Sequence, residues 1–179
     1  MEEPCIWATI KQRDAVIFYD DDFEIFIDPD WDTHNYFEFE INAFGTVWDL
    51  LLTKPYRANA LVFDQFDFKG LQSAVHVDGT INNALDVDKK WRAEVAIPLA
   101  AIGEAIFKNA LPQNGTLWRV NFSRVDWKME IGNGRYSKQL NKNGKPFPEN
   151  NWVWQPMGKI SLHEPEFWGI VQFAENNAL

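Results

Sequence analysis

The 179-residue chain is poor in cysteine and in basic residues. Its single cysteine, Cys5, excludes an intramolecular disulfide and a cysteine-based zinc site, and we interpret it as a small buried side chain. Lysine and arginine number 17 against 26 aspartates and glutamates, which gives a formal net charge of -9. Because phosphate groups are bound by basic surfaces, this charge argues against nucleic acid as a partner.

Long apolar runs are missing as well. No segment approaches the ~18 consecutive apolar residues of a membrane-spanning helix, so no membrane span is expected. Residues 1–4, Met-Glu-Glu-Pro, lack the pattern of a signal peptide, so the chain as given carries no export signal. The histidines, His34, His76 and His163, are far apart in the chain and form no recognisable triad. Each is therefore predicted to be a hydrogen-bonded structural residue.

Aromatic residues, by contrast, are abundant. They make up 15% of the chain and include nine tryptophans and fourteen phenylalanines. Tryptophan is large and amphipathic, and nine exceed what a core of this size needs. We therefore expect several of them at a binding surface.

Alternating apolar and polar residues predict short strands along the whole chain, because neighbouring side chains of a strand point to opposite faces. The length fits one domain, residues 1–179. About eight strands, many turns and one helix over 99–107 indicate an all-β fold, an antiparallel β-sandwich of the jelly-roll or immunoglobulin-like kind. The clearest strands are 23–28, 36–43, 46–52, 71–77, 91–97 and 116–125.

Other segments are less regular. Residues 5–10 resemble the end of a strand, residues 151–155 carry two tryptophans on one face if extended, and residues 159–162 and 168–173 are predicted as the last two strands. Residues 128–150 are rich in glycine, asparagine and lysine, which predicts a long mobile loop. Loops of that length in a compact domain often serve function.

The stretch 20–52 organises the rest of the chain. In its second strand, Phe37, Phe39 and Ile41 form an apolar row, while Glu38 and Glu40 belong to a polar row on the opposite face. The first strand divides in the same way. One face of this meander is therefore predicted to be core, and the other to be hydrated or functional.

The loop between these two strands is acidic. Asp28, Asp30 and Asp32 have the alternate spacing that lets a loop wrap oxygen atoms around a hard cation such as calcium. The loop does not match the calcium-binding helix-loop-helix, since Thr33 stands where glycine is required and the flanking segments are strands. A calcium site and a solvated turn remain the two interpretations.

Sugar recognition suits the remaining composition. A sugar ring has apolar faces edged by hydroxyls, so its binding site needs a flat aromatic face and groups that form bidentate hydrogen bonds. Glu24, Arg57, Asn121 and Arg124 supply the polar groups near several tryptophans. Those tryptophans, which lie in or beside loops or near polar rows, are Trp31, Trp48, Trp127, Trp152 and Trp154.

Three rival functions stay open. Glu24, Glu38 and Glu40 are candidates for a glycosidase carboxylate pair, although any polar strand face offers this spacing. A haem-binding electron-transfer domain would use Met129 or Met157 with a histidine. A structural or protein-interaction domain would place every tryptophan in its core.

Five sequence blocks, in this order, resemble the family-nine carbohydrate-binding modules, and the likeness extends to family-nine-like proteins of polysaccharide-degrading bacteria. The blocks are FEIFIDPDWDTHNYFEFEINAFGTVWDLLL (23–52), WRAEVAIPLAAI (91–102), WRVNFSRVDW (118–127), NWVWQP (151–156) and HEPEFWGIVQF (163–173).

The resemblance implies a β-sandwich without catalysis of its own, sugar bound between aromatic side chains, and structural calcium. It also implies export to the periplasm, the cell surface or the medium, often attached to or beside a glycoside hydrolase. Family members carry about one further strand pair at the N-terminus, so an N-terminally truncated domain with an exposed sheet edge is expected.

Residue by residue, Glu24 matches the acid of the family's EIFID motif, which helps bind sugar. Phe18 falls where the modules place one sandwiching tryptophan, Glu40 falls where they place a sugar-binding arginine, and no counterpart of the second tryptophan occurs near Leu162. The predicted carbohydrate-binding set is Phe18, Glu24, Trp48, Arg57, Asn121, Arg124, Trp127 and Trp154, with Asp28, Asp30 and Asp32 as the metal set.

Overall fold

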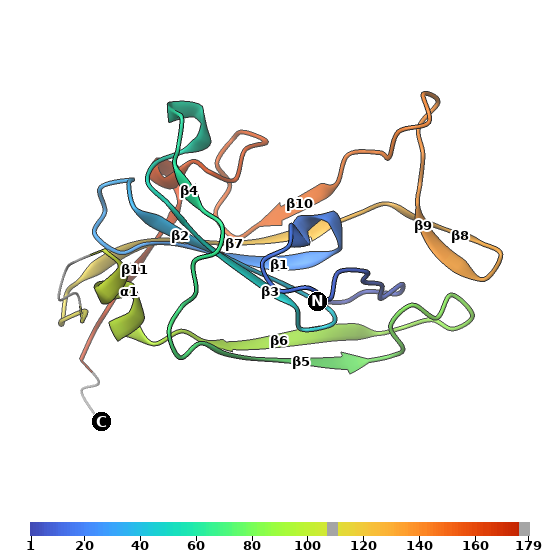
Figure 1. The fold of residues 1–179 in the computed structure, drawn as a ribbon, viewed down its shortest axis with the longest axis horizontal. Coiled ribbons are helices and arrows are strands. Elements are labelled where there is room, and N and C mark those ends of the chain that lie inside the picture. Colours follow the sequence, from blue (N-terminus) through green and yellow to red (C-terminus); the bar gives the residue numbers. More distant parts are fainter. Residues whose placement is uncertain (107–110, 176–179) are drawn as a thin grey trace.

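The computed structural model, which describes residues 1–106 and 111–175, is an antiparallel β-sandwich (Figure 1). Its large sheet has the strand order β10-β7-β1-β2-β3-β4, and β11 pairs with β7 on the edge that β10 also uses. The hairpin β5-β6 forms the second layer, and the hairpin β8-β9 projects from one end. The strands are β1 Asp22–Asp28, β2 Tyr36–Asn42, β3 Val47–Leu52, β4 Val62–Phe63, β5 Gln72–Asp78, β6 Lys90–Ala96, β7 Leu117–Asp126, β8 Met129–Gly132, β9 Arg135–Lys138, β10 Asn150–Val153 and β11 Gly169–Gln172.

Helical segments in the described residues are short. The α-helix α1 spans Leu99–Ala105, in agreement with the predicted start of the helix after Pro98. Phe107, the predicted last residue of that helix, lies outside the described residues. Three 3₁₀ turns complete the set: η1 Ile17–Tyr19, η2 Tyr56–Ala58 and η3 Pro165–Phe167.

The main core lies between the two layers. The apolar rows of β1 and β2, with Phe37 and Phe39 at the centre, pack against Val75 of β5 and Val95 of β6, and Ile102 of α1 closes one end. This face division follows from strand alternation, as predicted. The opposite face of the large sheet, called the outer face below, carries the polar row of β1 and β2 and a second apolar cluster that includes Tyr36, Leu50 and Trp168.

Residues 5–10 do not form a strand, contrary to the prediction. The segment is extended, but side-chain oxygens rather than a neighbouring strand accept its backbone N–H groups. Ile6 N donates to the Asp88 carboxylate, Ala8 N to the Asn82 amide oxygen, and Ile10 N to Asp20, at 2.8, 3.1 and 2.9 Å. A buried N–H needs an acceptor of some kind. Here the polar side chains of two loops take the place of a sheet partner.

Two further predictions near the C-terminus are wrong. The segment 128–150 is not a single loop, because β8 and β9 pair within it from Met129↔Lys138 to Gly132↔Arg135. Its turn residues Asn133 and Gly134 both have positive φ, 53° and 70°, the backbone that a tight two-residue hairpin requires. Residues 159–162 contain no strand, while β11 lies inside the predicted segment 168–173.

No helix among the described residues is long and apolar enough to cross a bilayer.

Candidate functional site

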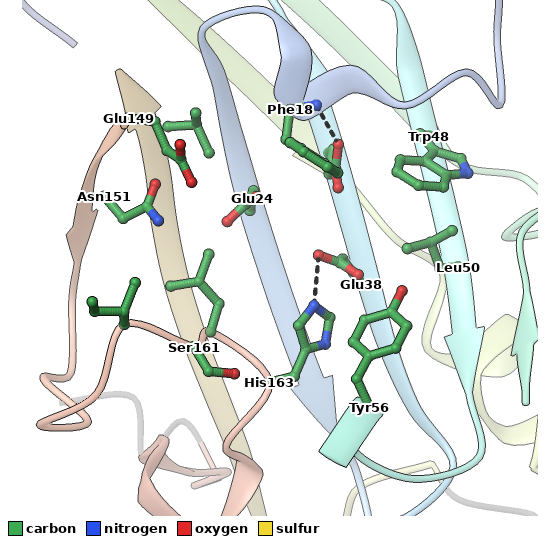
Figure 2. A pocket seen from close by; sticks show the side chains of 14 residues that line it. Phe18, Glu24, Glu38, Trp48, Leu50, Tyr56, Glu149, Asn151, Ser161 and His163 are labelled. Carbon is green, nitrogen blue, oxygen red and sulfur yellow. Dashed lines mark hydrogen bonds and ion pairs between the residues drawn. The ribbon is translucent and has the colours of Figure 1, made fainter. Parts of the chain in front are cut away.

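A pocket of about 370 Å³ opens on the outer face of the large sheet (Figure 2). Its floor consists of side chains from β1, β2 and β3, and its walls come from η1, η2, β10 and the segment 160–163. The residues that line it are Phe18, Glu24, Glu38, Glu40, Trp48, Leu50, Tyr56, Val125, Glu149, Asn151, Ile160, Ser161, Leu162 and His163.

Strand register arranges the floor in rows. Glu24 of β1 lies opposite Glu40 of β2, and Glu40 lies opposite Trp48 of β3. In the next row, Glu38 of β2 lies opposite Leu50 of β3. Asp22 precedes Glu24 by two residues on the same face of β1, and one carboxylate oxygen from each of Asp22, Glu24 and Glu40 lies within 4.8 Å of the other two. Like charges directly opposite on neighbouring strands destabilise a sheet, so this arrangement opposes folding.

Burial raises the pKa of all four carboxyl groups. The pKa of Glu24 rises to about 7, and those of Asp22, Glu38 and Glu40 lie well above their usual values. Loss of water is the largest cause in each case, and for the last three the neighbouring carboxylates add to it. Among the described residues that line the pocket there is no lysine or arginine.

Three aromatic rings line the pocket. Phe18 of η1 is 37% exposed, and its backbone N–H donates to Glu40 Oε2 at 3.0 Å. Trp48 is nearly buried, and its indole N–H donates to the Asp64 carbonyl at 2.9 Å. Tyr56 of η2 is half exposed and packs edge-on against His163. The pocket therefore combines ring faces with carboxylates, the pairing that binding of a sugar requires.

His163 enters the pocket from the segment before η3. Its Nδ1 lies 3.0 Å from the Tyr36 hydroxyl. Its Nε2 lies 3.7 Å from Glu38 Oε1, a contact that Figure 2 shows. Burial lowers the pKa of His163 to about 4, so the ring is neutral near pH 7. It therefore offers Glu38 a polar contact without a compensating positive charge.

Phe18, Glu24 and Trp48 of the predicted sugar-binding set line the pocket. Arg57 lies behind one wall, where its guanidinium donates to the His163 carbonyl at 3.1 Å and pairs with Glu164 at 3.0 Å and with Glu166. It holds the segment that carries His163. Asn121 lies on the outer face of β7, and its amide donates to the Gln155 carbonyl at 3.1 Å.

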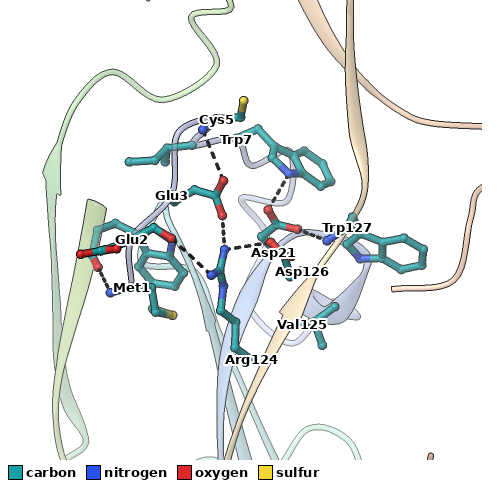
Figure 3. A network of polar contacts seen from close by, with 12 residues as sticks. Met1, Glu2, Glu3, Cys5, Trp7, Asp21, Arg124, Val125, Asp126 and Trp127 are labelled. Atoms are coloured by element: carbon teal, nitrogen blue, oxygen red, sulfur yellow. Dashed lines mark hydrogen bonds and ion pairs between the residues drawn. The ribbon is translucent and has the colours of Figure 1, made fainter. Parts of the chain in front are cut away.

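The other three members of the set lie away from the pocket. Arg124 pairs with Glu3 and, at 2.9 Å, with Asp126, in a network beside the N-terminus (Figure 3). Trp127 donates its indole N–H to the Phe18 carbonyl at 2.8 Å, and the Lys138 ammonium lies 3.3 Å from the centroid of its ring. Trp154 is 46% exposed and packs edge-on against Phe122.

The sugar-binding set missed Tyr56 and His163, and it held only one of the three floor glutamates. The alternation of β2 already placed Glu38 and Glu40 on the functional face, where they were considered as glycosidase carboxylates. No local pattern marks Tyr56 or His163. Tyr56 lies in the turn η2 just after β3, outside any alternating strand, and His163 comes from a segment distant in sequence from the floor.

The predicted metal loop is compact. Asp28, Asp30 and Asp32 each bring one carboxylate oxygen within 4.8 Å of the others. Asp28 also accepts the backbone N–H groups of Trp31 and Thr33, at 3.1 and 3.0 Å, although both residues adopt a left-handed backbone. Clustered carboxylate oxygens suit a hard cation such as calcium, so the residues fit the ion that the family resemblance implies.

Comparison with known proteins supports the fold. No protein-family model matches the sequence, and no curated protein matches it. Among solved structures, the fold is similar to that of a candidate carbohydrate-binding protein from Bacteroides uniformis, with a TM-score of 0.60 and 16% sequence identity. The match covers 96% of this chain and 67% of that chain. At this identity, the likeness shows a shared sandwich fold.

Proposed function

We propose that this protein is a non-catalytic carbohydrate-binding domain and that the outer-face pocket holds a sugar ring. The observation that carries the proposal is the meeting of three aromatic rings, Phe18, Trp48 and Tyr56, with the floor carboxylates in one pocket. Rings supply apolar faces for a pyranose, and carboxylates accept hydrogen bonds from its hydroxyls. The B. uniformis neighbour, described as a candidate carbohydrate-binding protein, supports the same function.

The family-nine resemblance extends this proposal. Its five ordered blocks support a place among family-nine-like domains, an exported location and an association with polysaccharide breakdown, including a linked or neighbouring glycoside hydrolase. Glu24, the acid of the matched EIFID block, lines the pocket, and so does Phe18, which stands at the position of a sandwiching tryptophan. Both positions are consistent with sugar binding at this site.

A glycan array followed by affinity electrophoresis tests the function. The protein is expected to be retarded by at least one polysaccharide, and Phe18→Ala is expected to weaken binding about tenfold or more, because the ring contributes stacking and buried area. Phe63→Ala is the matched control, since Phe63 is an exposed phenylalanine of β4 outside the pocket. No retention by any glycan, with or without calcium, would exclude the proposal.

The glycosidase hypothesis is tested by incubating the protein with aryl glycosides. It is favoured by the meeting of Glu24, Glu38 and Glu40 in one pocket and by the raised pKa of Glu24, a property of carboxyl groups that act as general acids. A flat time course with aryl glycosides is the expected result. If the protein hydrolysed an aryl glycoside and Glu38→Gln abolished the activity, the protein would be a glycosidase rather than a non-catalytic binding domain.

The haem and core-only alternatives have less structural support. Met157 is buried in the cluster on the outer face, where its sulfur lies 3.7 Å from Asn121 Nδ2, and neither Met129 nor Met157 lines the pocket with His163. Trp152 and Trp154 are 59% and 46% exposed, so the tryptophans are not all enclosed. A Soret band after reconstitution with haem would revive the first alternative.

We also propose that the loop of Asp28, Asp30 and Asp32 binds calcium. At a free calcium concentration about 100-fold above the dissociation constant, the ion should add roughly 2.7 kcal/mol to the free energy of unfolding. Thermal melting in calcium and in EDTA measures this, with Asp32→Asn expected to remove the effect and Glu24→Gln to retain it. A melting temperature unchanged at about 10 mM calcium, above the range of extracellular sites, would rule the site out.

A further inference from the structure

The outer-face pocket is lined by a group of acidic side chains. Its floor and rim hold Glu24, Glu38, Glu40 and Glu149, and Asp22 lies next to Glu24 on the same face of β1. None of the described lining residues is a lysine or an arginine, and His163 is neutral near pH 7. Buried carboxylates in proteins are normally paired with cations or bound to metals. Among the described residues, Glu24, Glu38 and Glu40 have neither partner, whereas the half-buried Glu149 interacts with the Lys138 ammonium.

Two of these carboxylates also have an oxygen without a hydrogen bond. Glu24 is 2% exposed, its side chain points into the pocket (Figure 2), and its Oε2 makes no hydrogen bond of ordinary geometry, although the Ser123 hydroxyl opposite it on β7 interacts with the carboxyl group. Asp22, which is fully buried, leaves Oδ2 without a partner. An unsatisfied buried acceptor is costly, and the cost is relieved when a ligand supplies a donor. Glu24 therefore marks the place where a donor group of the ligand would lie.

The pocket walls indicate that this donor belongs to an organic molecule. Phe18, Trp48 and Tyr56 present rings beside the carboxylates, and the pocket volume of about 370 Å³ exceeds what a bare ion would fill. Aromatic faces attract ammonium groups as well as sugar rings, and carboxylates form strong charge-assisted hydrogen bonds with an ammonium. A bare metal ion would leave these walls without a role.

We propose that the ligand of this pocket is a sugar that carries a protonated amino group, such as a 2-amino-2-deoxyhexose, with the ammonium bound at Glu24 and neighbouring Glu38 and Glu40. The proposal rests on the carbohydrate-binding function above and specifies its ligand. A neutral sugar would supply a donor to the free oxygen of Glu24 but no cation to favour the ionised form of the floor carboxyl groups. An ammonium would supply both the donor and the positive charge.

Three oligosaccharides with the same β-1,4-linked backbone test the proposal by isothermal titration calorimetry. The 2-position carries an amine in the glucosamine tetramer, an acetamide in the N-acetylglucosamine tetramer and a hydroxyl in cellotetraose. At about 0.15 M salt, where the Debye length of ~8 Å screens nonspecific surface attraction, the amine should bind at least about tenfold more tightly than either neutral sugar. Cyclohexylamine, a ring amine without hydroxyls, should bind more weakly than the glucosamine tetramer.

Variants locate the effect. Glu24→Gln and Glu38→Gln keep the size of the side chain, remove one floor charge each and should reduce the preference for the amine roughly tenfold, while circular dichroism confirms their folding. Glu94→Gln is the matched control, since Glu94 is an exposed glutamate of β6 in the other layer. It changes the net charge equally and should leave the preference intact.

Each other result overturns the proposal. Equal affinity for the three tetramers would support carbohydrate binding but would show that the pocket does not recognise the amino group. If cyclohexylamine bound as tightly as the glucosamine tetramer, the pocket would recognise an amine and not the sugar that carries it. Calcium that binds the pocket and displaces the amine, with the effect lost in Glu24→Gln, would make the floor a metal site. If all three tetramers fail to bind, the amino sugar is excluded, and the glycan array decides separately whether any sugar binds.

Discussion

Replacing Asp20 with alanine is expected to lower the free energy of unfolding by about 3–5 kcal/mol, the largest loss of stability expected for a polar residue in this chain. Asp20 is fully buried. Its Oδ2 accepts the backbone N–H groups of Thr9 and Ile10 at 2.8 and 2.9 Å and the Asn42 amide at 3.0 Å, and its Oδ1 accepts the Thr9 hydroxyl at 2.7 Å. Alanine would remove the acceptor of these four hydrogen bonds, two of which come from backbone N–H groups.

Urea denaturation measures this loss. Asp86→Ala is the control, because Asp86 is exposed and its carboxylate accepts the Thr80 hydroxyl, so its removal should change stability by less than about 0.5 kcal/mol. The loss of stability in Asp20→Asn, which keeps one oxygen acceptor, should lie between those of Asp20→Ala and Asp86→Ala. A loss below about 1 kcal/mol in Asp20→Ala would mean that water or a shifted backbone satisfies the donors of residues 9–10.

Replacing Glu24 with glutamine is expected to stabilise the fold at about pH 8, by roughly 2–3 kcal/mol, and to weaken ligand binding at the same time. Burial raises the pKa of Glu24 from 4.5 to about 7, so at pH 8 folding must hold an ionised carboxylate away from water. Glutamine keeps the shape of the side chain and removes that charge. Stability and function are thus expected to oppose each other at this position.

The pH dependence gives the sign of the effect. An acid with a raised pKa binds its proton more tightly in the folded state than in the unfolded state. The contribution of Glu24 to the free energy of unfolding is therefore fully present below pH 4.5 and is lost as the pH rises to about 7. The wild-type protein should therefore lose stability across this range, and Asp22, Glu38 and Glu40, whose pKa values are also raised, should add to the loss. Glu24→Gln should flatten the curve.

Urea denaturation at several pH values measures the slope of the free energy of unfolding against pH, with Glu94→Gln as the control. Glu94 is exposed on β6, and its substitution should leave the slope as it is in the wild type. If Glu24→Gln also left the slope unchanged, the carboxylate would already be compensated in the folded protein. The basis for an ammonium ligand would then be lost together with this prediction.

The division of the meander into a core face and a polar face could be predicted from local sequence. Alternation along β2 put Phe37 and Phe39 in the interlayer core and put Glu38 and Glu40 on the face that bears the pocket. Side-chain direction in a strand depends only on position, so it can be derived without knowledge of the partner strands. The sandwich class followed from the same periodicity.

The walls of the pocket could not be predicted in this way. Tyr56 and His163 come from segments more than 100 residues apart. Two contacts join these segments: the ring of Tyr56 packs edge-on against His163, and the guanidinium of Arg57 pairs with Glu164. Arg124 is a different case, because it follows Asn121 and Ser123 on the same strand but belongs to a network with Glu3 rather than to the pocket. Alternation turns Arg124 to the opposite face from Ser123, and long-range contacts then decide its partner.

The sequence by itself determined the all-β class, the inward and outward faces of the central strands and the acidic character of the functional face. The tertiary structure alone decided that Phe18, Tyr56 and His163 close over the floor glutamates, and that residues 5–10 are held by the carboxylates of Asp20 and Asp88 in place of a strand. The physical reason is range. Strand alternation is a local property of the backbone, whereas the way in which loops pack over a sheet face depends on contacts between residues far apart in the chain.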